Sequence, residues 1–204
     1  MNFNIALGMF FLQVQPLLST RVLVIGIDGF DSKCKPVLPN IDRLAAEGSS
    51  TYAARTNLLA ISAPGWTSML CSMNSADSGV LENDFLPPWI LKWKNPMSST
   101  TKEKPFKCIY ENVKTQIPGS KIYAYYDWFY MTFLGRFGIG YVDFETLCLS
   151  FQYFACDPFV PYQSIKAIED KDFTLLFNYY VSLDETGHAD KFCSKKYIEH
   201  MKLI

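Results

Sequence analysis

Two stretches of the chain are mainly apolar and end abruptly in polar residues. The first runs from Arg21 to Ile27, and the second runs from Phe173 to Leu183. An apolar run without polar alternation is typical of a parallel strand that helices cover on both faces. We therefore predict two buried strands, and we expect the first of them to be central in its sheet.

The residues between these two runs predict an alternation of helices and strands. A helical period covers residues 38–48, with Ile41, Leu44 and Ala45 on one face and Gly48 as the stop. Strands that alternate with helices predict an α/β fold with a largely parallel central sheet and helices on both faces. The other predicted elements are strands near 50–56, 121–126 and 139–144, and helices near 62–70, 106–116 and 162–171.

The composition is that of a folded globular domain. Of the 204 residues, 49% are hydrophobic and 16% are aromatic, which is enough apolar material for a sizeable core. The net charge is −1, so there is no electrostatic case for binding nucleic acid. No domain boundary is visible after residue 21, and we treat 21–204 as one domain.

Residues 1–20 are either a degenerate leader or signal segment, or an additional N-terminal element. Residues 5–12 are apolar, but no basic side chain precedes them, and Leu17 and Leu18 are poor residues for a cleavage site. The run is too short for a stable membrane span. We expect a secreted or lumenal protein if the segment is a signal, and a cytoplasmic one otherwise.

The six cysteines show no Cys-x-x-Cys spacing, which argues against a zinc ribbon. Several of them lie among apolar residues, as buried free thiols do. We therefore expect mostly free cysteines, and spacing alone assigns no partners. They are Cys34, Cys71, Cys108, Cys148, Cys156 and Cys193.

Asp28 and Gly29 come directly after the first predicted strand. Ligands of open α/β sheets bind beyond the carboxyl ends of the strands, so Asp28 is a candidate metal ligand. Gly29 would permit a tight turn or a close approach of the backbone. The alternative is an ordinary turn, in which Asp-Gly is frequent.

Ser62 precedes a predicted helix, because Pro64 favours the first helical turn. Free N–H groups at a helix N-terminus attract negative charge, so Ser62 is a candidate nucleophile toward phosphorus if a metal lowers its pKa. The alternative, favoured by position alone, is a helix cap. Asn83 follows this helix and is either a donor to a developing oxyanion or a turn residue.

Asp184 and His188 follow the second predicted strand. A carboxylate and an imidazole suit zinc or a similar divalent ion. We expect a loop here, in which Gly187 lets the chain fold back so that both groups face one ion.

Taken in order, these segments resemble the alkaline-phosphatase-like superfamily, and within it the type I phosphodiesterase and nucleotide pyrophosphatase branch. The resemblance covers most of residues 21–190 and implies that the chain is the N-terminal part of such a catalytic core, incomplete at its C-terminal side. The matching segments are 24–30, 38–48, 62–64, 66–70, 79–83, 184 and 187–188.

The resemblance implies a two-zinc hydrolase of phosphodiester or nucleotide pyrophosphate bonds, acting on a small phosphate ester or nucleotide. Ser62 corresponds to the nucleophile that forms a covalent phospho-enzyme, and with Asp28 it would bind the first metal. Asn83 corresponds to a donor to a phosphate oxygen. Asp184 and His188 correspond to ligands of the second metal, which orients the attacking water.

The chain also departs from this family. The family has a later Asp-His pair and one further histidine, whereas this chain has only His188 and His200, and we interpret His200 as a surface residue. Trp66 stands where sulfatases carry arginine, which argues against a formylglycine sulfatase. Two alternatives therefore stay open: a remnant or fragment that binds without turnover, and a phosphomonoesterase or phosphomutase of the same superfamily.

An aromatic segment follows Asn83 and reads as a long loop. In the resembling family this region shapes the substrate pocket, so its aromatic side chains would stack on a nucleobase or another leaving group. The alternative, which we favour, is that they pack the loop onto the core. They are Phe85, Trp89 and Trp93.

Overall fold

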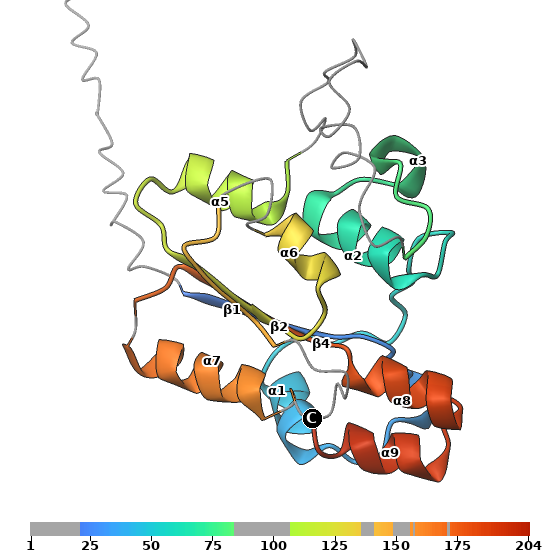
Figure 1. Ribbon diagram of the computed structural model, residues 1–204. Coiled ribbons are helices and arrows are strands. Elements are labelled where there is room, and N and C mark those ends of the chain that lie inside the picture. The colour runs from blue at the N-terminus through green and yellow to red at the C-terminus, as the bar shows by residue number, and fades with distance from the viewer. Residues whose placement is uncertain (1–20, 84–106, 136–140, 149–155, 157, 171) are drawn as a thin grey trace, which may run out of the picture.

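The computed structural model describes residues 21–83, 107–135, 141–148, 156, 158–170 and 172–204 (Figure 1). The strands are β1 (Val22–Ile27), β2 (Ile122–Tyr126), β3 (Phe144–Leu147) and β4 (Leu175–Tyr180). The helices are α1 (Pro39–Glu47), α2 (Ser62–Cys71), α3 (Ser75–Ser78), α5 (Ile109–Gln116), α6 (Tyr130–Leu134), α7 (Phe159–Asp170), α8 (Ser182–Asp190) and α9 (Lys195–Met201), with a short 3-10 helix η1 (Ser32–Cys34).

The four described strands form one parallel sheet in the order β1-β4-β2-β3. Figure 1 shows α2, α5 and α6 on one face of this sheet and α7 on the other. The predicted α/β fold with a parallel sheet and helices on both faces is confirmed.

Alternating side chains of the strands build a core on each face of the sheet. Ile122, Ala124 and Tyr126 of β2 belong to the larger cluster, which includes residues of α2, α5 and α6. Tyr123 and Tyr125 belong to a second cluster with residues of α7 and β4. Every residue of β4 is buried, as expected for a strand inside a sheet with two covered faces.

The position of β1 differs from the prediction. Among the described strands β1 lies at one end of the sheet, and the side chains of Leu23 and Ile25 are 41% and 54% exposed. The expectation of a central strand was wrong. An apolar sequence indicates that a strand can be buried, but it does not indicate which strands lie beside it.

Several predicted elements are shifted or absent. The α1 helix ends before Gly48 as expected, but none of its residues is buried. Residues 50–56 form no strand, and β3 begins at Phe144, where the predicted strand was to end. Residues 184–188 were predicted to form a loop after the last strand, but they belong to helix α8. His200, expected on the surface, is buried, and its Nε2 lies 2.9 Å from the Ser182 hydroxyl.

All six cysteines form disulfide bonds, so the expectation of mostly free thiols was wrong. The partners come from distant parts of the sequence or from across a short loop, and only the tertiary structure brings them together. The pairs are Cys34–Cys193, Cys71–Cys108 and Cys148–Cys156, with S–S distances of 2.14, 1.99 and 2.16 Å.

Among the described residues, no helix has both the length and the apolar character that crossing a membrane requires.

Candidate functional site

The carboxyl ends of β1 and β4 lie side by side. Ile27 pairs with Tyr180, and the N–H of Asp28 donates to the Tyr180 carbonyl over 2.9 Å. Because α8 begins two residues after β4, the residues that follow the two strands meet at one edge of the sheet. This edge is where ligands of open α/β sheets bind.

Gly29 brings the backbone after β1 against α8. Its φ angle is +67°, a left-handed conformation that glycine adopts without strain. A Cβ atom at Gly29 would lie 2.5 Å from Cα and 2.8 Å from Oδ1 of Asp184. Only glycine fits there, so the predicted close approach has a concrete partner in Asp184.

Three hydrogen bonds orient the Asp28 carboxylate. Its Oδ2 accepts from the Tyr179 hydroxyl over 2.6 Å and from the Trp66 indole N–H over 3.2 Å. Its Oδ1 accepts from the N–H of Gly29 over 2.9 Å. Burial, followed by the charge of Asp28, raises the pKa of Tyr179 well above its ordinary value, so this hydroxyl stays a donor. Asp28 therefore connects β1, β4 and α2.

Asp184 and His188 lie on α8, four residues apart. A spacing of four places both side chains on one face of a helix, and His188 Nε2 is 3.3 Å from Asp184 Oδ2. The prediction of a loop at these residues was wrong. Gly187 was expected to let a loop fold back. In the helix it instead makes room for Phe192, because a Cβ atom there would lie 2.5 Å from the Phe192 ring.

The environment of Asp184 disfavours its negative charge. Burial, followed by the nearby charge of Asp28, raises the pKa of this carboxyl to about 6, whereas His188 acts in the opposite direction. Neighbouring carboxylates that raise each other's pKa are a common arrangement where a cation neutralises both.

Ser62 and Asn83 lie together at the N-terminus of α2. Ser62 is the first residue of this helix, and the Asn83 side-chain oxygen accepts the N–H of Ala63 over 2.8 Å. Because this contact uses the acceptor of the amide, the NH₂ group is the part of Asn83 that can donate to a ligand.

Trp66 links this helix end to Asp28, one helical turn after Ser62. Gly26 permits that arrangement, because a Cβ atom on this residue of β1 would lie 2.4 Å from the Trp66 ring. The sequence interpretation did not assign a structural role to Trp66 or to Tyr179. The available signals were the position of Trp66 four residues after Ser62 and that of Tyr179 at the end of a strand.

The turn after β1 is also fastened from α9. The Tyr197 hydroxyl donates to the Gly29 carbonyl over 2.5 Å and accepts from the N–H of Asp31 over 2.9 Å. The disulfide Cys34–Cys193 joins the same turn to the α8–α9 connection. These contacts hold Gly29 against α8, and no local pattern in the sequence indicates them.

A compact group of potential metal ligands exists among the described residues, but it is not the predicted set. Among the described residues, the one group of three His, Cys, Asp or Glu side chains with ligand atoms within 4.8 Å of one another is Asp31, Cys34 and Cys193. Both of its sulfurs are in a disulfide, so this group is not a metal site.

The ligand atoms of Asp28, Asp184 and His188 are therefore not all within 4.8 Å of one another. Their chemistry still fits a divalent ion, because carboxylate oxygen and imidazole nitrogen are zinc ligands, and burial, followed by the charge of Asp28, raises the pKa of Asp184. A metal held here would need further donors, for example the hydroxyl of Ser62.

Neither a protein-family model nor a curated protein matches the chain. The aromatic residues predicted to shape a substrate pocket, Phe85, Trp89 and Trp93, lie outside the described residues.

Proposed function

We propose that this chain forms the nucleophile side of a metal-dependent hydrolase site for phosphodiester or nucleotide pyrophosphate bonds. The observation that supports this most directly is the close approach of Gly29, the residue after Asp28, to Asp184 across the ends of β1 and β4, together with the effect of the Asp28 charge on the pKa of Asp184. Trp66 ties this acidic pair to the helix that begins at Ser62.

In this proposal the Ser62 oxygen attacks phosphorus, the bond from phosphorus to the leaving oxygen breaks, and water then hydrolyses the seryl phosphate. The N–H groups at the start of α2 favour the negative charge of the phosphate. The NH₂ group of Asn83 donates to a non-bridging oxygen, while its own oxygen stays on the Ala63 N–H.

The residues that would hold metal follow from the same arrangement. Asp28 and Ser62 would share one divalent ion, and Asp184 and His188 would hold a second, with zinc the ion that the resemblance implies. Bound ions would lower the pKa of the Ser62 hydroxyl and stabilise charge on the leaving oxygen. Tyr179 and Trp66 keep the Asp28 carboxylate oriented.

A second candidate function is binding of a phosphate ester without turnover. Of the two histidines, only His188 is open to solvent, since His200 is buried with its Nε2 at 2.9 Å from the Ser182 hydroxyl. Fewer imidazole ligands than the resembling family uses would weaken metal binding and slow the generation of hydroxide.

The test is hydrolysis of bis(4-nitrophenyl) phosphate by the chain with added zinc. We expect Ser62→Ala to reduce kcat/KM by on the order of a thousandfold, because the covalent step is lost. Ser62→Thr is the matched control, since it keeps a hydroxyl at the same position. Activity of Ser62→Ala within about tenfold of the parent, some 1.4 kcal/mol, would show that Ser62 is not the nucleophile.

Zinc content separates the two candidate functions. If the chain binds zinc, loses it in Asp184→Asn and His188→Ala, and yet shows no hydrolysis, binding without turnover is correct. Unchanged zinc content in both variants would contradict the metal assignment itself.

A further inference from the structure

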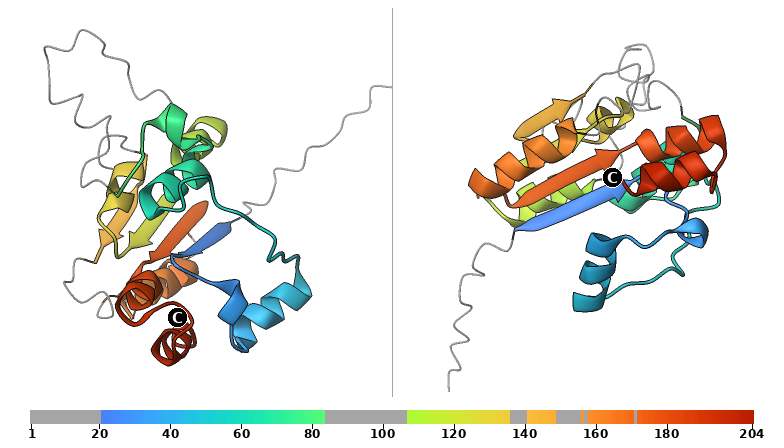
Figure 2. Two further views of the ribbon diagram at one scale, coloured as in Figure 1. Left: turned by 90° about the vertical axis from the view of Figure 1, so that its right-hand side faces the viewer. Right: turned by 90° about the horizontal axis from the view of Figure 1, so that it is seen from below.

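A cavity of about 370 Å³ lies between α7 and the strands β2 and β3. Helix α7 packs against β2 and β4, and Figure 2 shows it along the sheet between β3 and β4. The volume is in the range of pockets that bind small molecules. Trp66 and Tyr179 of the candidate site pack in the core cluster on the other face of the sheet, so the cavity is separate from that site.

Three aromatic rings form the strand side of the cavity. Tyr123 and Tyr125 of β2 line it together with Phe144 of β3. Phe144 is the register partner of Tyr123, and the two ring centroids are 4.5 Å apart. Because Phe144 is half-exposed, part of its ring is available to a ligand.

The hydroxyls of the two tyrosines lack partners in the part of the chain that the structure describes. Tyr123 and Tyr125 are only 8% and 6% exposed, yet neither hydroxyl forms a hydrogen bond there. Neither is among the fully enclosed polar atoms without a partner, so each hydroxyl reaches open space, and both side chains line the cavity. Buried polar groups are normally hydrogen-bonded, so each hydroxyl has a bond to offer to a molecule in the cavity.

Asp170 places a negative charge near both hydroxyls. Burial, followed by Tyr123 and Asp170, raises the pKa of Tyr125 to about 12. Burial is also the largest cause of the raised pKa of Tyr123, and the charge of Asp170 adds to it. Asp172 acts on Tyr123 as well, but its ion-pair partner Lys121 acts in the opposite direction. Both hydroxyls therefore stay protonated at neutral pH, in a negative local field.

The other charged residues of the lining leave this field unbalanced. Both carboxylate oxygens of Asp143 accept from Lys114, over 2.8 and 2.6 Å. Glu145 pairs with Ala124, which belongs to the cluster on the other face, so its side chain points away from the cavity. Lys166 is exposed and is not among the charges that act on either tyrosine. A cation is therefore the charge that fits beside the tyrosines.

We propose that this cavity binds an organic cation of the arylalkylamine class, a protonated amine joined to a flat ring. The ammonium group donates to the Asp170 carboxylate and to the two tyrosine hydroxyls, and its charge lies close to the aromatic faces. The flat ring packs against Phe144. A neutral or acidic ligand would leave the charge of Asp170 unpaired, and an aliphatic amine would leave Phe144 uncovered.

The first test is isothermal titration calorimetry with 2-phenylethylamine, without added zinc. We expect a dissociation constant below about 1 mM. The matched ligands 2-phenylethanol and 3-phenylpropanoate carry the same ring with a neutral and a negative group, and they should bind at least about tenfold more weakly. No binding of the amine, equal binding of the alcohol, or tighter binding of the acid would overturn the proposal.

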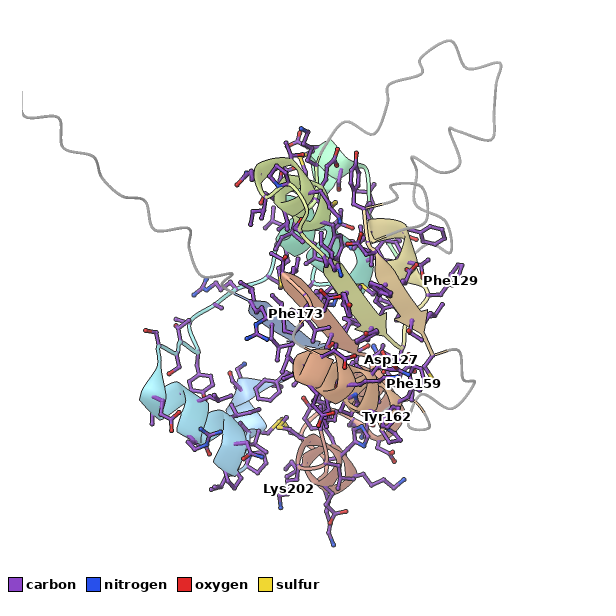
Figure 3. The ribbon with its side chains drawn as sticks, turned by 90° about the vertical axis from the view of Figure 1, so that its left-hand side faces the viewer. Asp127, Phe129, Phe159, Tyr162, Phe173 and Lys202 are labelled. Carbon is purple, nitrogen blue, oxygen red and sulfur yellow. A yellow bond between two sulfur atoms is a disulfide. The ribbon has the colours of Figure 1, made fainter. Side chains whose placement is uncertain are left out.

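The second test locates the amine with conservative variants. Asp170→Asn should weaken its binding by about tenfold, because a charge-assisted hydrogen bond is lost, and Tyr125→Phe should weaken it by about threefold. Asp170 is exposed at the end of α7, so its variant should keep the fold. The control is Tyr162→Phe, since Tyr162 is 65% exposed on α7 and does not line the cavity (Figure 3). Unchanged affinity in both test variants would contradict the assignment.

Discussion

At the scale of single residues, two glycines determine how closely α2 and α8 approach β1 at the candidate site. Gly26 makes room for the ring of Trp66, and Gly29 makes room for Asp184. Any side chain at either position would separate the elements that carry Asp28 and its neighbours. The close approach at Gly29 brings Asp184 near enough to Asp28 for the charge of Asp28 to raise the pKa of Asp184, and this effect can be measured.

The pH dependence of stability should report on Asp184. Its pKa rises from 3.8 to about 6 on folding, so the folded chain binds more protons than the unfolded chain between these values. Stability is then greatest below about pH 4 for this group and falls as pH rises toward 6. Asp184→Asn should remove this fall and stabilise the metal-free chain above pH 6 by roughly 1–3 kcal/mol.

Urea denaturation with a chelator present, at several pH values, measures this effect. A parent whose stability is flat between pH 4 and 6 would contradict the raised pKa of Asp184. Added zinc should reverse the order of parent and Asp184→Asn if the pair holds metal.

At the scale of elements, α8 and α9 decide where the turn after β1 lies. The spacing of Asp184 and His188 suits a helix as well as a loop, and the helix places both side chains on one face. The α9 helix then holds the turn through Tyr197, whose side chain is fully buried. A C-terminal helix that looks like a polar tail in the sequence is thus part of the support of the site.

Tyr197→Phe should destabilise the chain by about 1–3 kcal/mol, because it leaves the Gly29 carbonyl and the Asp31 N–H without their partner. Urea denaturation gives the value. Tyr162→Phe, on the exposed side of α7, should change stability by less than about 0.5 kcal/mol. Equal effects of the two variants would show that the Tyr197 hydroxyl does not fasten this turn.

At the scale of the whole molecule, three disulfides join segments that the sheet alone leaves apart. Their presence is typical of proteins that fold in an oxidising compartment. The bond Cys34–Cys193 spans 159 residues, whereas Cys148–Cys156 spans 8. The two therefore constrain the unfolded chain to very different extents.

Loop entropy predicts about 5 kcal/mol for the longer loop and about 2.5 kcal/mol for the shorter one. Replacing Cys34 and Cys193 by alanine should therefore cost more stability than replacing Cys148 and Cys156. Denaturant unfolding of the two double variants measures the difference, and thiol titration of the unfolded parent should find no free cysteine. A detectable thiol, or a greater loss from the shorter loop, would contradict this pattern.

Much of the fold follows from local patterns. The apolar runs identify β1, β2 and β4, and Pro64 and Gly48 mark the start of α2 and the end of α1. Residues 50–56 did not form the expected strand, because no local signal tells whether a partner strand lies alongside. His200 was misjudged because its burial depends on Ser182, eighteen positions away in sequence.

The sequence by itself determined the order of strands and helices and the polar residues that follow each strand, because these depend on side-chain periodicity and turn chemistry within a few residues. The tertiary structure alone decided that Gly29 packs against Asp184, that Trp66 and Tyr179 hold the Asp28 carboxylate, and which cysteines pair. These contacts join residues far apart in the chain. Their geometry depends on the strand order and on the close approach at Gly29, neither of which any short stretch of sequence encodes.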